Sequence, residues 1–116
     1  MSTILALDQA SRVTGYSIFK DGQFHKYGKI VANSSDIGDR LKLIRDSVQN
    51  LIEQYGVNEV ILEDIQLQEN VGNNVATFKT LAEVLGVIIE LLTELDIPYT
   101  AVLAGTWRKG LGIAGN

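Results

Sequence analysis

Two carboxylates stand at the ends of two short apolar segments. Asp8 follows the segment 3–7 (TILAL), and Glu63 follows 59–62 (EVIL), with Asp64 directly after it. Continuous apolar runs of this length are typical of strands that are covered on both faces. If the two strands lie side by side and parallel, both carboxylates reach the same edge of one sheet. With nothing between them, the two charges would repel each other.

A divalent cation would remove that repulsion. Mg²⁺ prefers oxygen ligands, often one or two carboxylates together with water and phosphate oxygens. Two such ions about 4 Å apart can activate a water and stabilise the leaving oxygen of a phosphodiester. On this interpretation Asp8 is the central ligand, while Glu63 and the neighbouring Asp64 contribute to one metal. A second interpretation stays open, because a carboxylate just past a strand is often a solvated turn residue or a cap.

The elements that must position these acids follow from the hydrophobic pattern. Residues 14–32 predict two strands joined at 21–22 (Asp-Gly), a strong signal for a two-residue hairpin. Residues 41–55 carry apolar side chains at helical spacing, with a capping residue at 35–36. Gly56 is expected to end this helix.

A polar loop at 66–74 separates the second apolar strand from a longer helix. That helix is predicted to bury one stripe of side chains: Phe78, Leu81, Leu85, Ile88, Leu92 and Leu95. Pro98 then opens a short strand. The order β-β-β-α-β-α-β predicts an α/β fold, a mixed five-stranded sheet with helices packed on it. In such sheets ligands bind at the carboxyl ends of the parallel strands.

Composition narrows the class of protein. The 116 residues suit one domain, and the 46% hydrophobic content supports a core. No run reaches the roughly 18 apolar residues needed to span a membrane, and the N-terminus lacks a secretory leader. The absence of cysteine excludes disulfides and is consistent with a cytoplasmic protein. The net charge of −4 argues mildly against nucleic acid, although bound metal would cancel the charge of an acidic cluster.

Three segments around the acids add specificity. They are SRVTGY at 11–16, RLKLI at 40–44 and VILED at 60–64. In this order and spacing, and through TWRKGLGI at 106–113, the chain resembles the RuvC-type Holliday-junction resolvases. The resemblance implies a ribonuclease-H-like fold, a homodimer, and nicking of four-way DNA junctions in recombination and repair with two Mg²⁺ or Mn²⁺ ions. It also implies contacts with other recombination proteins.

The resemblance implies four acidic residues, of which Asp8 matches the first and Glu63 the second. The other two are expected in a helix beyond Asn116, so residues 1–116 are expected to form a single ribonuclease-H-like domain that lacks this helix and has little or no activity. The chain departs from the family pattern at 9–10, which is Gln-Ala rather than Pro-Gly, at Asp64 rather than Gln, and in a loop without an aromatic wedge. These departures suggest a divergent, phage-like branch.

The residues expected to contact DNA are polar or basic and flank the same sheet edge: Arg12, Gln66, Asn70, Asn73, Asn74, Lys79, Arg108 and Lys109. Amides and a helix N-terminus could bind backbone phosphate, and the cations could hold it. Each also has an ordinary explanation as a turn residue, a cap or a solvated charge.

Two other functions remain open. An actin- or hexokinase-like phosphotransferase also places an Asp at the end of its first strand, but Ala10 stands where such a loop needs glycine. A non-catalytic module that binds branched DNA would fit a chain without the second pair of acids.

Overall fold

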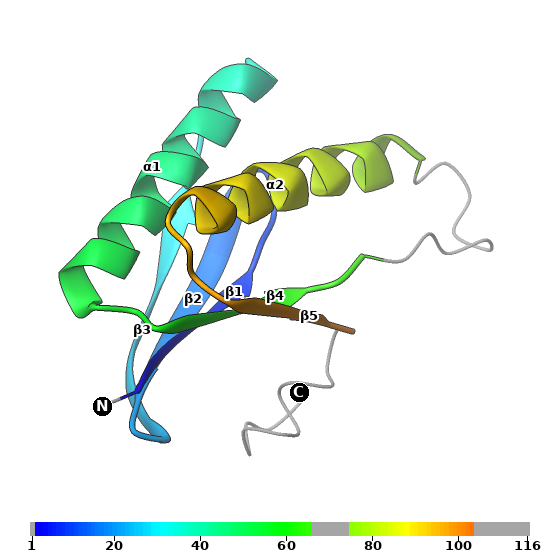
Figure 1. Ribbon diagram of the computed structural model, residues 1–116. Helices are drawn as coiled ribbons and strands as arrows, with labels where there is room; N and C mark the ends of the chain where they lie inside the picture. The colour runs from blue at the N-terminus through cyan, green and yellow to red at the C-terminus, as the bar shows by residue number, and fades with distance from the viewer. Residues whose placement is uncertain (1, 66–74, 104–116) are drawn as a thin grey trace.

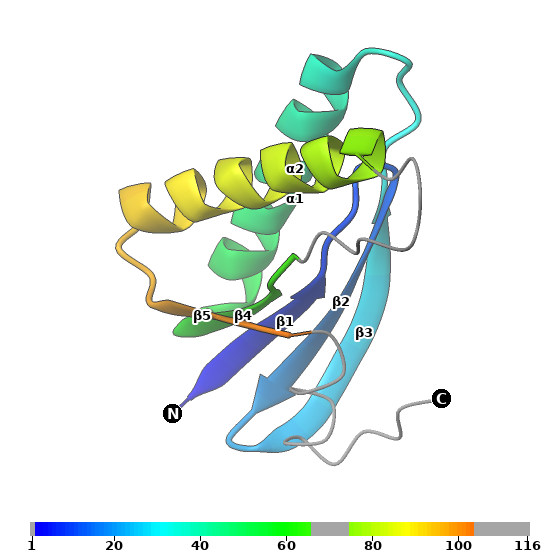
Figure 2. The ribbon, with the colours of Figure 1, turned by 90° about the vertical axis from the view of Figure 1, so that its right-hand side faces the viewer.

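The computed structural model describes residues 2–65 and 75–103 (Figure 1). In this part of the chain five strands form one sheet in the order β3-β2-β1-β4-β5. The strands are β1 (Thr3–Asp8), β2 (Val13–Lys20), β3 (Gln23–Val31), β4 (Glu59–Glu63) and β5 (Tyr99–Val102), and the helices are α1 (Ile37–Tyr55) and α2 (Val75–Glu94). The predicted element order and mixed α/β sheet are confirmed, and both helices lie over the same face of the sheet (Figures 1 and 2).

The hairpin between β2 and β3 turns where the sequence predicts it. Asp21 and Gly22 both have positive φ, at 53° and 82°. A two-residue turn with positive φ at both positions matches the right-handed twist of the flanking strands. The hairpin pairs Lys20 with Gln23 and continues to Val13 opposite Val31.

Helix α1 has well-defined ends. The Asp36 carboxylate accepts a hydrogen bond from the Asp39 N–H at 2.9 Å and so caps the first turn. Gly56 ends the helix in the left-handed conformation, at φ 61° and ψ 46°, and its N–H donates to the Ile52 carbonyl. Both predicted boundaries are confirmed, because each depends on a short local signal.

The core lies between the sheet and the two helices. Leu5 and Leu7 of β1 and Val60 and Leu62 of β4 are fully buried there against apolar residues of α1 and α2. In α2 the buried side chains are Val84, Ile88, Leu91 and Leu92, so the predicted stripe is only partly correct. Its N-terminal members are half-buried, because α2 carries apolar residues on most of its sides and the period alone does not select the core face.

The pairing of β1 with β4 decides where the acids lie. The two strands are parallel, with Ile4 opposite Glu59 and Ala6 opposite Ile61. β5 is also parallel to β4, so three strands end at one edge of the sheet. The condition under which both acids reach the same end of the sheet is therefore met. Within residues 2–65 and 75–103, no helix is long and apolar enough to cross a membrane.

The cap of α1 gives a stability prediction. Replacing Asp36 by Ala leaves the Asp39 N–H without its acceptor, and the free energy of unfolding should fall by about 1 kcal/mol. Chemical denaturation measures this loss. Asp46→Ala is the matched control, because Asp46 pairs only with the exposed Lys42 on the same helix and is worth a few tenths of a kcal/mol. Equal losses in the two variants would contradict the capping role.

Candidate functional site: the carboxyl edge of the sheet

The structure brings Asp8 and Glu63 to the same place. The ladder between β1 and β4 reaches Ala6 and Ile61, and the two acids lie two residues further along each strand. Level positions on neighbouring strands present their side chains to the same face. Asp8 is exposed and Glu63 is half-buried. On the neighbouring β2, the residue paired with Asp8 is Gly15, which has no side chain that could cover the Asp8 carboxylate. The two carboxylates can therefore act on one solvent-accessible group.

The side-chain amide of Gln9 joins the two strand ends. Its Nε2 donates to the Glu63 carbonyl, and its Oε1 accepts the Glu63 N–H at 3.2 Å. Gln9 is 5% exposed, so these bonds are shielded from water. We call this pair of bonds the Gln9 clamp. It continues the sheet's main-chain pairing through a side chain and fixes the backbone of Glu63 relative to Asp8.

Thr14 holds the loop after Asp8 in place from the buried side of the sheet. The fully buried Thr14 hydroxyl donates to the Ala10 carbonyl at 2.7 Å and accepts the Ala10 N–H at 3.1 Å. The Arg12 carbonyl accepts the N–H of Ala32 at 2.8 Å, which ties the same loop to the end of β3. Residues of the SRVTGY segment thus have a structural role, because they fix the conformation of the loop that follows Asp8.

Asp64 is arranged differently from the pair. Its N–H donates to the Val102 carbonyl at 2.6 Å, so it continues the line of β4 beside β5. Its carboxylate accepts the Ile65 N–H at 2.9 Å. Because side chains alternate along a strand, Asp64 is expected on the opposite face from Glu63. Its role as a metal ligand stays a prediction.

The donor set at this edge suits a hard cation. Asp8 and Glu63 offer carboxylate oxygens, which are the ligands that Mg²⁺ and Mn²⁺ favour. In the ranges 2–65 and 75–103 no group of three or more His, Cys, Asp or Glu side chains gathers as a metal centre would require. The pair therefore fits part of a magnesium or manganese site, and further oxygens would have to come from water, substrate or other segments.

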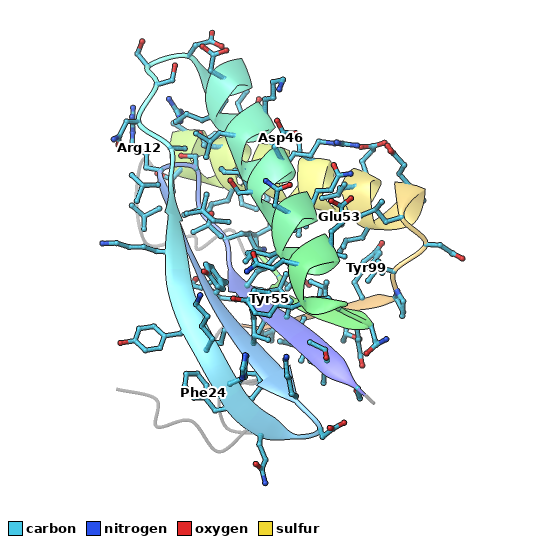
Figure 3. All side chains as sticks on the ribbon, turned by 90° about the vertical axis from the view of Figure 1, so that its left-hand side faces the viewer. Arg12, Phe24, Asp46, Glu53, Tyr55 and Tyr99 are labelled. Carbon is cyan, nitrogen blue, oxygen red and sulfur yellow. The ribbon has the colours of Figure 1, made fainter. Side chains whose placement is uncertain are left out.

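The residues expected to contact DNA fall into two groups. Arg12 lies exposed in the loop after Asp8, and Lys79 lies exposed on the second turn of α2. Figure 3 shows Arg12 at the end of the sheet where α1 begins. The others lie outside the described residues, and their roles stay predictions: Gln66, Asn70, Asn73, Asn74, Arg108 and Lys109.

A second arginine enters the site from α1. Arg40 is the first residue of the RLKLI segment, and its sequence position gave no indication of a chemical role. Its side chain is buried and lines a pocket beside the loop after Asp8. The burial of Gln9 and Arg40 could not be found from sequence. Both residue types are usually exposed, so neither gives a periodic signal.

A second cluster of cations lies at the opposite end of the sheet. Lys20 and Lys26 approach the Tyr55 ring, with their Nζ atoms 5.8 and 5.7 Å from its centroid. The exposed His25 ring contacts the same tyrosine in an edge-on geometry. A hydrogen bond with Tyr55 raises the pKa of Lys26. Since Lys20 pairs with Thr3 at the start of β1, this cluster is distant from the acids and takes no part in the site.

Comparison with known proteins agrees with this geometry. The family model described as "Crossover junction endodeoxyribonuclease RuvC" matches residues 4–107, which include both acids, the Gln9 clamp and Arg40. The chain belongs to the RuvC family. Among curated relatives, the RuvC of Shewanella sediminis is 33% identical over 121 residues. The match covers 98% of this chain and 68% of that protein.

Solved structures show the same fold at lower identity. The Thermus thermophilus RuvC in complex with a Holliday junction substrate matches with a TM-score of 0.76 and 12% identity, over 94% of this chain and 69% of that one. The ribonuclease H1 of the halophilic archaeon Halobacterium salinarum matches with a TM-score of 0.50 and 19% identity, over 91% and 89%. The ribonuclease-H-like fold expected of a RuvC-family protein is confirmed.

The Gln9 clamp can be tested by an apolar side chain of similar length. Gln9→Met removes both hydrogen bonds to the half-buried Glu63 main chain, so the free energy of unfolding should fall by about 1–3 kcal/mol. Urea denaturation measures it. Gln49→Met is the control, because Gln49 bonds to Glu53 on the surface of α1. Unchanged stability in Gln9→Met would show that the clamp is not formed in solution.

Proposed function

We propose that this RuvC-family protein is a structure-selective endodeoxyribonuclease, which nicks four-way DNA junctions by metal-dependent phosphodiester hydrolysis in recombination and repair. The observation that carries the proposal is the level position of Asp8 and Glu63 at the carboxyl ends of two parallel strands, in a chain whose residues 4–107 match the RuvC family. The RuvC of Thermus thermophilus, which has this fold, was solved with a Holliday junction substrate.

The two acids have distinct tasks in this proposal. Asp8, exposed and beside Gly15, would be the central metal ligand, and Glu63 would contribute to one metal. When bound, Mg²⁺ or Mn²⁺ supplies an activated water and stabilises the leaving oxygen. The protein's part is geometric, since the Gln9 clamp fixes the main chain that carries Glu63 and Thr14 fixes the loop after Asp8. Rigid strand ends keep both carboxylates in place before substrate arrives.

Several finer properties follow from the family. We propose two ions per site, a homodimer that acts on the two-fold symmetric junction, and contacts with other recombination proteins in the cytoplasm. The symmetry argument is physical: two like strands must be cut, and a dimer with a two-fold axis presents one site to each.

Neutralising either carboxylate tests the catalytic assignment. The assay uses the protein from its complete reading frame, because the family pattern needs two more acids and residues 104–116 contain none. Asp8→Asn and Glu63→Gln should each lower cleavage of a four-way junction by at least about 100-fold with Mg²⁺ or Mn²⁺, while junction binding is retained. Asp46→Asn, on the exposed surface of α1, should cleave normally.

Junction cleavage, junction binding and ATP binding together distinguish the rival functions. Junction binding without cutting in either cation would indicate a non-catalytic module. Tight ATP binding by the unaltered protein would indicate a phosphotransferase. Retained cleavage in Asp8→Asn would exclude the proposed site.

The dimer is tested by mass. Light scattering on the protein from the complete reading frame should give twice the mass of one chain at micromolar concentration, with and without junction DNA. A single-chain mass on the DNA would refute the proposed symmetric arrangement.

A further inference from the structure

Arg40 is a buried cation that has little to compensate it. Its side chain is 8% exposed, and its Nη1 donates to the Ser34 carbonyl at 2.8 Å. Its Nε has no hydrogen-bond partner. The ion pairs found in the described part of the chain involve Lys42 and Arg45 and not Arg40. Burial of a guanidinium without an anion is unfavourable, so this position favours a negatively charged ligand from outside.

Arg40 lines a pocket of about 500 Å³ where an anion can enter. The exposed Arg12 lines the same pocket, and the hydroxyls of Ser11 and Thr77 add two donors. Thr80 also lines it, but its hydroxyl already donates to the Ala76 carbonyl at 3.0 Å. Its remaining walls are apolar, from Ala10, Val13, Ala76 and Leu81. None of these side chains is acidic, so no carboxylate of the lining competes with an anionic ligand for the two arginines.

The start of α2 adds to the positive potential. Ala76 and Thr77, the second and third residues of this 20-residue helix, line the pocket. The first N–H groups of a helix have no partner within it, and its N-terminal end carries a partial positive charge. Phosphate groups commonly bind such ends. Here the helix supports a site that the buried Arg40 already indicates.

The pocket lies beside the proposed metal site. Arg12 is four residues after Asp8 in the loop that Thr14 and Ala32 hold in place. We propose that this pocket binds a backbone phosphodiester of the junction other than the one being cut. Arg40 and Arg12 donate charge-assisted hydrogen bonds to its oxygens, and so set the position of the DNA relative to Asp8 and Glu63. This inference rests on the proposed function and extends it.

Neutral linkages placed one at a time in the DNA test the contact. The probe is a four-way junction in which single phosphates near the crossover are replaced by methylphosphonates. Binding is measured by fluorescence anisotropy with Asp8→Asn protein, which keeps the DNA uncut. At one linkage the substitution should weaken binding by about 10-fold or more, because hydrogen bonds to charged groups contribute about 1.5–3 kcal/mol.

Coupling to the arginines then identifies the partner. Arg40→Gln should weaken binding to unmodified DNA by a similar factor. In this variant, the methylphosphonate at that linkage should cause little further loss of affinity. The salt dependence of binding should also fall by about one phosphate contact. Arg12→Gln, an exposed change that leaves folding intact, should show the same coupling. Arg45→Gln is the control, because Arg45 on the same helix already pairs with Glu90 and Glu94.

The outcomes are separable. Additive losses at every linkage for both Arg40→Gln and Arg12→Gln would overturn the pocket assignment while leaving the nuclease proposal in place. If Arg40→Gln does not fold, the Arg12→Gln coupling decides alone. If the protein with unaltered arginines has no higher affinity for four-way junctions than for duplex DNA, the proposed function fails, and this inference fails with it.

Discussion

The candidate site depends on one amide that takes the place of a peptide group. Beyond Ala6 and Ile61 the ladder between β1 and β4 ends. Asp8 is then supported by β2 and Glu63 by β5, and no main-chain pairing joins the two strand ends directly. The Gln9 amide restores both a donor and an acceptor at that point, and its burial removes the competition of water. Because the bonds go to the main chain of Glu63, they fix where the carboxylate begins without engaging its oxygens. The geometry of the site and the proposed metal binding thus belong to different residues.

The residues around the acids also divide into those that hold the main chain and those whose side chains face a ligand. Thr14 holds the loop after Asp8 from inside the core, and the end of β3 holds it through the Arg12 carbonyl. That leaves the Arg12 side chain exposed, where it reaches the pocket that Arg40 lines from α1. Oxygen ligands on one side and cations on the other are the two requirements of an enzyme that must bind a polyanion and cut it.

Much of the fold was predictable because its signals are local. The turn at 21–22 and the two ends of α1 depend on single residues with known backbone preferences, and each formed as predicted. The apolar runs before Asp8 and Glu63 predicted two buried strands but left open whether these are parallel neighbours, as the structure shows them to be. The buried face of α2 was not predictable, because apolar residues surround most of that helix and packing alone chooses among them. The Gln9 clamp was also unpredictable, since it joins residues 54 positions apart. Arg40 has a sequence context that fits an exposed helical cation equally well.

The pocket has three walls that come from different parts of the chain: the loop after β1, the start of α1 and the start of α2. A ligand held there bridges elements that must separate when the protein unfolds. By linkage, any molecule that binds the folded form and not the unfolded chain raises the unfolding temperature in proportion to the logarithm of its excess. The stability of the protein would then vary with the concentration of its substrate. The buried charge of Arg40 destabilises the protein without DNA and would stabilise the complex with DNA.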